Sequence, residues 1–422
     1  MHEALLDLLR CPFCGTRLEL VENAALVRHD GAIEFGVLGC QCCAFPIVAG
    51  IPVLIADDAT RGAMHALETG RREEALCALL ALDADRTERF TALLPRLDQT
   101  TFRETLELLS PDAEGTYFLY RFSDPTFLTA EALVRAVGQQ DGALAGPVLD
   151  LCGGSGHLTR VLAGLRRPSS ASSSFGARVT VVADLHFWKL WLATRFTAPG
   201  CPAVCCDAAA PLPFARNLFS MVVLADAFPY IWHKRLCADE MMRLTRPDGI
   251  LLMPHLHSAH GDNFSAGDTL TPEGYRELFA ECQPRLFSEA RLFEDLIEHA
   301  VVDLTQELSP SELGTEAALT LVACRRNDRF RRHCLPDMLP ATGELVVNPL
   351  YRVERRDDAT VLTLTFPTPE YEEEFGACRR YLPNTVTVDA DLGGQIDRAT
   401  LGARYDELRR RRVLIDAPPH YC

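Results

Sequence analysis

The spacing of apolar residues predicts that helices and strands alternate through the middle of the chain. Four apolar runs are typical of buried strands: residues 147–151, 179–183, 219–225 and 250–254. Four segments repeat apolar residues at helical spacing: 130–137, 158–165, 186–195 and 235–244. Strands that alternate with helices indicate βαβ units and a parallel sheet covered on both faces. We therefore expect an α/β fold in this region.

The flanking regions differ from this pattern. The start of the chain concentrates Cys, Gly and short β-branched runs, and an Ala/Leu/Glu/Arg-rich helical stretch comes next. After residue 326 we expect a hairpin of strands 351–355 and 361–366 around the turn Asp357–Asp358, then a helix and a strand at 413–416. These changes predict four regions: a small cysteine-rich domain at 1–58, a helical linker at 59–116, an α/β domain at 117–326 and a C-terminal α+β extension at 327–422, of winged-helix-like or lid type.

Composition narrows the class of protein. The 422 residues include 42 Lys+Arg and 58 Asp+Glu, which gives a net charge of −16, and 48% of residues are apolar. This balance is typical of a globular protein, and the acid excess disfavours nucleic acid as a partner, because phosphate contacts require Lys and Arg. No apolar run reaches the roughly 18–20 residues of a membrane span, and the start of the chain lacks a signal peptide. We expect a cytoplasmic protein with no membrane contact.

Two Cys-x-x-Cys turns stand near the start of the chain. They are Cys11-Pro-Phe-Cys14 and Cys40-Gln-Cys-Cys43. Paired thiolates in two tight turns suit tetrahedral zinc, which stabilises segments too small to bury a core. A thioredoxin-like dithiol is the less favoured alternative, since it needs one pair in a βα turn. We predict a structural zinc ion held by Cys11, Cys14, Cys40 and Cys43, with Cys42 as an alternative to Cys40 or Cys43.

Residues 5–55 resemble the small zinc-binding activator subunits of tRNA and release-factor methyltransferases. The resemblance is specific in Cys11-Pro-Phe-Cys14, in Phe45-Pro46-Ile47 and in Gly50-Ile51-Pro52. In that family the module binds a methyltransferase, covers its hydrophobic surface and performs no chemistry. The resemblance therefore implies a stabilising module fused to its own catalytic domain.

A glycine-rich turn comes after the first strand of the α/β region. The sequence Asp150-Leu-Cys-Gly-Gly-Ser-Gly156 places glycines where the backbone passes close to a ligand, ahead of a helix. Its spacing differs from that of the dinucleotide fingerprint, because a third glycine is missing at Thr159. The pattern instead resembles the first motif of class I S-adenosylmethionine-dependent methyltransferases. Cys152 occupies the first glycine position, a departure that an ordinary φ would tolerate.

Further motifs of the same family occur in order across about residues 117–326. Asp184 resembles the carboxylate that accepts both ribose hydroxyls, and Asp207 the one that contacts the adenine amino group. Taken singly, each has a solvated loop carboxylate as its alternative. The resemblance implies a Rossmann-like doubly wound methyltransferase sheet. It also implies S-adenosylmethionine contacts from Asp150, Cys152, Gly153, Gly154, Gly156, Asp184, Leu185, Asp207, Ala208, Asp226 and Tyr120.

Candidate catalytic residues stand after the later strands. They are His257, His255, Asp226 and Tyr230, with His233 nearby. Ligands of open α/β sheets bind beyond the carboxyl ends of the strands, where these residues are expected to lie. His257 is our first choice as a general base, because it stands farther past its strand than His255. A packing histidine is the alternative for each.

These observations predict an S-adenosylmethionine-dependent methyltransferase that acts on O, N or S of a small molecule or peptide, in specialised metabolism. The main alternative is an RNA or protein methyltransferase, since relatives of the zinc module serve such enzymes. A catalytically silent scaffold or binding protein that retains the cofactor fold is the second alternative.

Overall fold

The computed structural model describes residues 1–140, 142–165, 179–265, 267–335, 343–356, 359–389, 392 and 396–422. The predicted hairpin turn Asp357–Asp358 lies outside these residues. So does the Ser-rich run at residues 169–174, within the long interval between Gly156 and Asp184.

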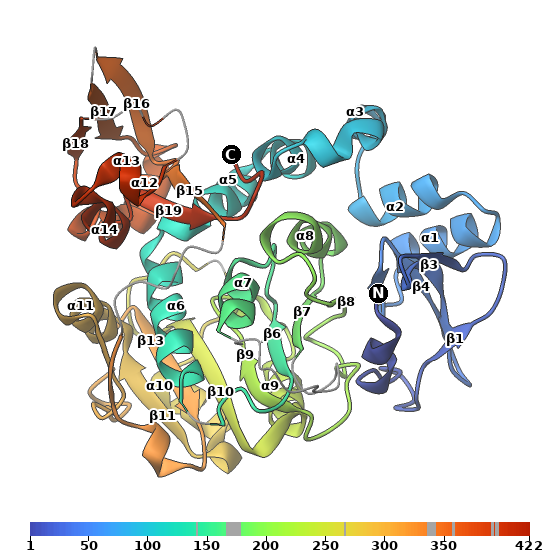
Figure 1. The fold of residues 1–422 in the computed structure, drawn as a ribbon. Coiled ribbons are helices and arrows are strands. Elements are labelled where there is room, and N and C mark those ends of the chain that lie inside the picture. Colours follow the sequence, from blue (N-terminus) through green and yellow to red (C-terminus); the bar gives the residue numbers. More distant parts are fainter. Residues whose placement is uncertain are drawn as a thin grey trace.

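A seven-stranded sheet forms the centre of the molecule, in the order β11-β13-β10-β9-β6-β7-β8 (Figure 1). Its strands are β6 Val148–Leu151, β7 Thr180–Asp184, β8 Ala203–Cys205, β9 Phe219–Val223, β10 Thr245–His257, β11 Pro284–Ser288 and β13 Ala318–Ala323. The five neighbouring strands β8, β7, β6, β9 and β10 pair in parallel, and β13 runs antiparallel to β10 and β11. The predicted α/β fold with a doubly wound, Rossmann-like sheet is confirmed.

Helices cover both faces because alternate residues of each strand enter different cores. Val148 and Met221 pack with α6 (Pro125–Gly138), α7 (His157–Gly164) and α8 (Phe187–Leu192). Leu149 and Val222 pack on the opposite face, with α9 (Lys234–Leu244) and α10 (Pro272–Leu278). Burial on both faces explains why these strands are almost uniformly apolar.

The N-terminal module contains η1 (Glu3–Asp7) and a five-stranded antiparallel sheet. Its strands are β1 Glu19–Val21, β2 Val27–His29, β3 Ala32–Gly39, β4 Ala44–Val48 and β5 Ile51–Pro52. The module joins the central sheet at its edge, where Val53 forms a parallel bridge with Cys205 and the amide of Leu54 donates to the Cys205 carbonyl at 2.8 Å. The two sheets therefore meet through backbone hydrogen bonds as well as side chains.

Five helices come after the module and run across the molecule to the central domain (Figure 1). They are α1 Asp58–Glu68, α2 Arg72–Leu80, α3 Ala84–Leu93, α4 Phe102–Leu109 and α5 Ala113–Tyr120. Local capping begins several of them. Thr101 and Glu104 form a capping box at α4, and the side chain of Asp57 accepts the Thr60 amide at 2.7 Å at α1.

The C-terminal extension has its own core and an α+β composition, as predicted. It comprises β15 Glu344–Val347, β16 Tyr351–Arg356, β17 Ala359–Leu364, α12 Pro369–Phe375, β18 Thr385–Val388, α13 Arg398–Leu401, α14 Arg404–Arg410 and β19 Leu414–Ala417. Strands β16, β17 and β18 form an antiparallel sheet, and β15 pairs with β19. Between the central sheet and this core, β12 (Val301–Asp303), which comes after α11 (Glu289–His299), pairs with β14 (Arg332–Cys334).

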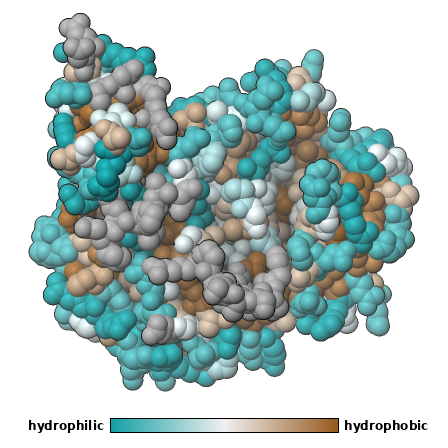
Figure 2. All heavy atoms as spheres, in the orientation of Figure 1, coloured by the Kyte–Doolittle hydropathy of each residue, from teal (hydrophilic) through white to brown (hydrophobic). Residues whose placement is uncertain are grey.

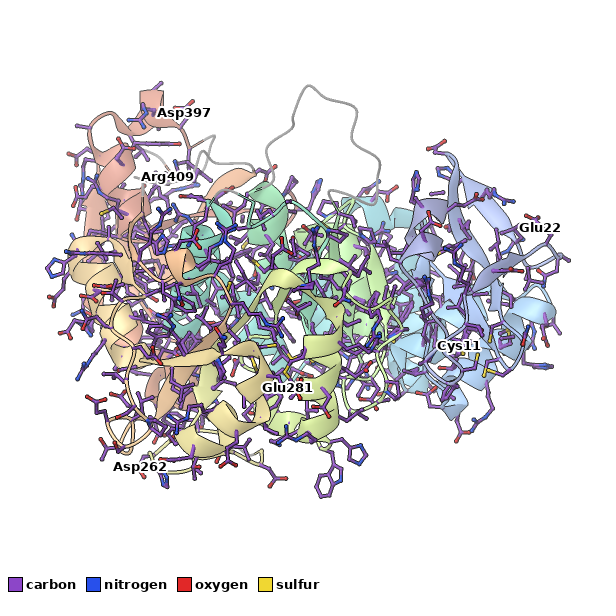
Figure 3. All side chains as sticks on the ribbon, turned by 90° about the horizontal axis from the view of Figure 1, so that it is seen from below. Cys11, Glu22, Asp262, Glu281, Asp397 and Arg409 are labelled. Carbon is purple, nitrogen blue, oxygen red and sulfur yellow. The ribbon has the colours of Figure 1, made fainter. Side chains whose placement is uncertain are left out.

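The extension and the N-terminal module lie at opposite ends of the molecule. Figure 3 shows Asp397 and Arg409 at one end and Cys11 at the other. Hydrophilic side chains cover most of the face seen in Figure 2. Across the described ranges, no helix combines the length and apolar character needed to cross a membrane.

Candidate functional site

The glycine-rich turn joins β6 to α7 in a conformation that favours glycine. Gly154 and Gly156 have φ of 55° and 82°. A Cβ at Gly154 would lie 2.9 Å from the Phe118 ring, and one at Gly156 would lie 2.8 Å from the Cβ of Ala193. Cys152 also has a positive φ, 57°, so the ordinary φ that would tolerate this departure from glycine is absent. Its left-handed backbone costs an L-residue about 1–2 kcal/mol.

Two carboxylates hold this turn in place. The carboxylate of Asp184, buried at the end of β7, accepts the Gly154 amide at 3.0 Å and the His186 amide at 2.9 Å. Asp150 lies beneath the turn, where its carboxylate accepts the Thr159 hydroxyl at 2.6 Å. Burial, together with the charge of Asp184, raises the pKa of Asp150 to about 7.

The residues beside Asp184 suit an amphipathic nucleoside. Leu185 is 43% exposed, and Asp207 lies just past the neighbouring strand β8, where its side chain accepts the Ala209 amide at 2.7 Å. Carboxylates match ribose hydroxyls and an exocyclic amine, and an exposed leucine matches the apolar face of a base. This donor set fits S-adenosylmethionine, and the individual contacts remain predictions.

Two aromatic residues of α5, Tyr120 and Phe118, contact different parts of the molecule. Tyr120, a predicted cofactor contact, packs on Tyr371 of the C-terminal extension with ring centroids 5.5 Å apart. Phe118 lies next to Gly154 instead. Phe118 was not predicted from the sequence, because α5 carries neighbouring aromatic residues and only the packing shows which one meets the turn.

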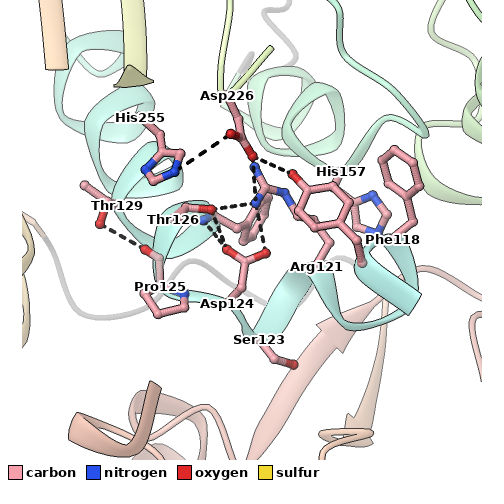
Figure 4. Close-up of polar contacts among 12 residues, drawn as sticks. Phe118, Arg121, Ser123, Asp124, Pro125, Thr126, Thr129, His157, Asp226 and His255 are labelled. Carbon is pink, nitrogen blue, oxygen red and sulfur yellow. Dashed lines mark hydrogen bonds and ion pairs between the residues drawn. The ribbon is translucent and has the colours of Figure 1, made fainter. Parts of the chain in front are cut away.

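Three predicted catalytic residues meet at the carboxyl ends of β9 and β10, and we call them the Asp226 cluster: Asp226, His255 and His257. Figure 4 shows Asp226 and His255 facing each other. His255 Nε2 and His257 Nε2 lie 3.8 and 3.6 Å from Asp226 Oδ1. Asp226 and His255 have φ of 65° and 57°, and the β10 register shifts between Met253 and Leu256. This irregular backbone directs the side chains toward one point.

Groups from three helical segments surround the Asp226 cluster. The Tyr117 hydroxyl donates to Asp226 Oδ2 at 2.9 Å, and Arg121 Nη1 lies 4.0 Å from the same oxygen. Glu289 Oε1 lies 2.8 Å from His255 Nδ1. The sequence did not identify Glu289, which is brought to the site by α11; the only local signal was its position after the helix-capping Ser288.

Charges in the Asp226 cluster are strongly coupled. Burial opposes ionisation, but the two histidines and Arg121 hold the pKa of Asp226 below its usual range. Burial also disfavours a charged His255, yet Glu289 and Asp226 raise its pKa to about 9. The cluster is thus a balanced set of charges in a largely buried place.

Tyr230 and His233 lie outside the Asp226 cluster. Tyr230 is 62% exposed on η6 (Phe228–Tyr230). His233 is exposed, with its Nδ1 2.9 Å from the Ala209 carbonyl oxygen. The catalytic role of Tyr230 stays a prediction that this position does not favour.

The N-terminal cysteines gather as a second group: Cys11, Cys14, Cys40 and Cys42. The Sγ–Sγ distances are 3.7 Å for Cys11–Cys42, 3.8 Å for Cys14–Cys40 and 3.5 Å for Cys40–Cys42. Zinc–sulfur bonds of about 2.3 Å separate tetrahedral sulfurs by about 3.8 Å, so the group fits zinc. Hydrogen bonds from Thr16 and Cys42 lower the pKa of Cys14 to about 6, whereas burial and neighbouring thiols raise the pKa values of Cys11 and Cys42.

The fourth cysteine of this group is Cys42, which the sequence left open as an alternative to Cys40 or Cys43. Cys42 joins Cys11, Cys14 and Cys40, whereas Cys43 does not belong to the group. The Cys43 amide instead points at Cys40 Sγ, 3.3 Å away. Cys43 Sγ lies 3.4 Å from Cys42 Sγ, at the edge of the group, and spacing alone does not show which of the two adjacent cysteines completes it.

Comparison with known proteins connects these features. Residues 149–253 match the family described as a methyltransferase domain. The chain carries a methyltransferase domain. The match spans the glycine-rich turn, Asp184, Asp207 and Asp226, and it confirms the predicted class, an S-adenosylmethionine-dependent methyltransferase. His255 and His257 stand just beyond the matched residues of the methyltransferase domain.

Solved structures of methyltransferases show weak similarity to the chain. An S-adenosylmethionine-dependent methyltransferase from Thermotoga maritima is 12% identical over 53% of this chain and 99% of that one, with a TM-score of 0.34. Phosphoethanolamine N-methyltransferase 2 from Haemonchus contortus, in complex with S-adenosylmethionine, is 14% identical over 54% and 60%, with a TM-score of 0.36. A complex of the Trm112 activator and a methyltransferase from Haloferax volcanii gives 16% over 47% and 93%, with a TM-score of 0.30.

At these values the similarities say nothing about the acceptor of the methyltransferase domain. Among curated proteins, none matches the sequence.

Proposed function

We propose that this methyltransferase transfers the methyl group of S-adenosylmethionine to O, N or S of a small molecule or peptide, in the cytoplasm and in specialised metabolism. The observation that carries the proposal is the position of the Asp226 cluster. β6 pairs with β9, and β9 with β10, all in parallel. The glycine-rich turn and the Asp226 cluster therefore extend from the same edge of the sheet, as a cofactor and its acceptor require.

Methyl transfer requires the chain mainly to hold the cofactor and the acceptor in line with each other. The bound cofactor supplies the electrophilic methyl group. Asp184, Asp207 and the glycine-rich turn would hold it, and the cluster would orient the acceptor and take its proton. His257 remains our choice for the proton acceptor.

A compact acceptor is favoured by the surroundings of the Asp226 cluster. Tyr117, which bonds Asp226, has its ring 6.1 Å from that of Phe375 in α12 of the C-terminal extension. His257 is 7% exposed. An extension packed beside a buried cluster leaves less room for a long polymer than for a small molecule, consistent with a lid role for this region.

The N-terminal module is proposed to bind zinc as a structural element and to stabilise the methyltransferase domain in the same chain. Its backbone bonds to β8 and its place in the core of one sheet face support this role. It contributes no residue to the Asp226 cluster.

Incubation with methyl-labelled S-adenosylmethionine and separate pools of metabolites, peptides, folded proteins and RNA tests the acceptor class. Label in the metabolite or peptide pool is the expected result. Label confined to RNA, or to folded proteins, would replace the proposal with the corresponding alternative. Cofactor binding without transfer to any pool would favour the scaffold.

A further inference from the structure

We propose that the Asp226 cluster binds a divalent transition-metal ion through Asp226 Oδ1, His255 Nε2 and His257 Nε2. This site would be separate from the cysteine group of the N-terminal module. Its binding can be tested without the proposed transfer reaction, and only its role in that reaction rests on the proposed function.

The distances within the cluster favour an ion between the three groups. Asp226 Oδ1 lies 3.6 Å from His257 Nε2 and 3.8 Å from His255 Nε2, and all three atoms lie within 4.8 Å of one another. Both of the distances to Oδ1 are too long for hydrogen bonds. Metal bonds of about 2.1 Å separate neighbouring ligand atoms by about 3.0–3.4 Å, close to the spacing seen here.

The outer contacts match those that metal sites use. Glu289 Oε1 bonds His255 Nδ1 at 2.8 Å, which leaves Nε2 to face the centre of the cluster. The Tyr117 hydroxyl donates to Asp226 Oδ2 at 2.9 Å, which leaves Oδ1 to face the same point. Metal-binding histidines and carboxylates are ordinarily held by such second partners.

His257 provides an independent observation. Its side chain is 8% exposed, its Nδ1 is buried with no hydrogen-bond partner among the described atoms, and its Nε2 points at Asp226 from beyond bonding distance. Nε2 of this buried imidazole has no partner within hydrogen-bond distance, and a metal ion bound there would supply one. Nδ1 would keep none, unlike Nδ1 of His255, which bonds Glu289.

The donor set specifies the class of ion. Two imidazoles and one carboxylate suit Mn²⁺, Fe²⁺, Co²⁺, Ni²⁺ or Zn²⁺, whereas thiolates select zinc at the cysteine group. Three protein ligands leave coordination positions open. An acceptor oxygen or a water molecule would take one of them, so the ion would place a positive charge beside the group to be methylated.

Titration with Mn²⁺ of tag-free protein that holds one zinc ion per chain, at the cysteine group, tests the inference, with binding followed by electron paramagnetic resonance. Loss of the free Mn²⁺ signal is expected at one ion per chain. His255→Ala and His257→Ala should each weaken binding by more than a hundredfold, and Glu289→Gln by about 10–100-fold. His260→Ala, which changes an exposed histidine in the loop after β10, should bind like the parent.

Glu289→Gln and Tyr117→Phe keep the size of each side chain, so they remain informative if the histidine variants fail to fold. Absence of Mn²⁺ and Co²⁺ binding by the parent would overturn the inference. Binding that none of the cluster variants weakens would also overturn it. Methyl transfer that persists in chelator-treated protein with no metal in the cluster would overturn the role of the ion in transfer and leave the proposed function intact. Metal binding without cofactor binding would overturn the proposed function and leave the metal site intact.

Discussion

His257 is the residue on which the proposed acceptor site depends most. It is the last residue of β10, it is nearly buried, and its ring faces Asp226. Its imidazole is placed to act on the acceptor directly or through a bound ion. Either role requires the ring, and neither involves the cofactor turn.

His257→Ala should therefore slow methyl transfer by about 10²–10⁴-fold, with nearly unchanged affinity for S-adenosylmethionine. Single-turnover rates and calorimetry measure the two effects separately. His260→Ala serves as the control and should keep the parent rate. Equal turnover in His257→Ala and the parent would make His257 a packing residue.

Asp150 gives a prediction on pH. Its folded-state pKa of about 7 is above the ordinary value of 3.8, so the folded protein binds this proton more tightly than the unfolded chain does. Its contribution to stability is therefore full below about pH 4 and is lost as the pH rises toward 7, by at most about 1.4 kcal/mol per pH unit. Asp150→Asn cannot ionise and should lack this loss.

Denaturant unfolding of the parent and Asp150→Asn at several values between pH 5 and pH 7 measures the difference. The stability of the variant relative to the parent should increase with pH. Parallel curves would show that Asp150 has an ordinary pKa.

At the scale of residues, the sequence identified side chains that stand directly after a strand but not those that approach from elsewhere. The common location of Asp226, His255 and His257 was predictable, because parallel strands end at one edge of the sheet. Glu289 and the Tyr117–Asp226 bond were not, because they depend on how α11 and α5 pack. The positive φ at the first glycine position of the turn was equally hidden, since sequence does not report backbone strain.

Among the elements, long apolar strands were predictable and short or inserted ones were not. β6, β7 and β9 match the predicted runs within two residues, and β10 contains its predicted run but is longer at both ends. β8 has only three residues, and β13 enters the sheet antiparallel between β10 and β11. Order in the sheet depends on tertiary packing, which no local pattern encodes.

The C-terminal segment stabilises the start of α4 and the start of α7. The His420 carbonyl accepts the Phe102 amide at 2.7 Å, and the Tyr421 hydroxyl lies 2.8 Å from His157 Nε2 and 3.1 Å from the Phe118 carbonyl oxygen. The side chains of Phe102, His157 and Tyr421 are buried in one aromatic cluster. The segment thus supports the helix that begins after the glycine-rich turn.

Tyr421→Phe should lower the free energy of unfolding by about 1–3 kcal/mol, because it leaves buried polar atoms without a partner. Thermal and denaturant unfolding measure the change. Tyr405→Phe removes the hydroxyl of a half-buried tyrosine in α14 and should cost less. Equal stability of Tyr421→Phe and the parent would show that the hydroxyl is not needed there.

For the whole molecule, the N-terminal module and the methyltransferase domain form one packed unit. Leu9 and Phe45 of the module share a core with Phe214 and Val204 of the domain. The β-bridge from the end of the module to Cys205 extends the central sheet into the module. Damage to the module should therefore affect the domain.

We expect one zinc ion per chain, lost in Cys42→Ser and retained in Cys43→Ser, because Cys42 completes the group of four sulfurs. Metal analysis of the purified variants checks this pair. Zinc loss should also lower the unfolding temperature of the whole chain. Zinc retained in Cys42→Ser and lost in Cys43→Ser would make Cys43 the fourth ligand, as the spacing of the cysteines predicts.

Calorimetric titration with S-adenosylmethionine tests the central claim, that the glycine-rich turn and Asp184 form the cofactor site. The parent should bind, and Asp184→Ala should bind about tenfold or more weakly, because it would remove the predicted charge-assisted hydrogen bonds to the ribose. Asp248→Ala is the control, because it removes an exposed carboxylate ahead of the buried part of β10. It should bind S-adenosylmethionine like the parent. No binding by the parent, or equal binding by Asp184→Ala, would contradict the account.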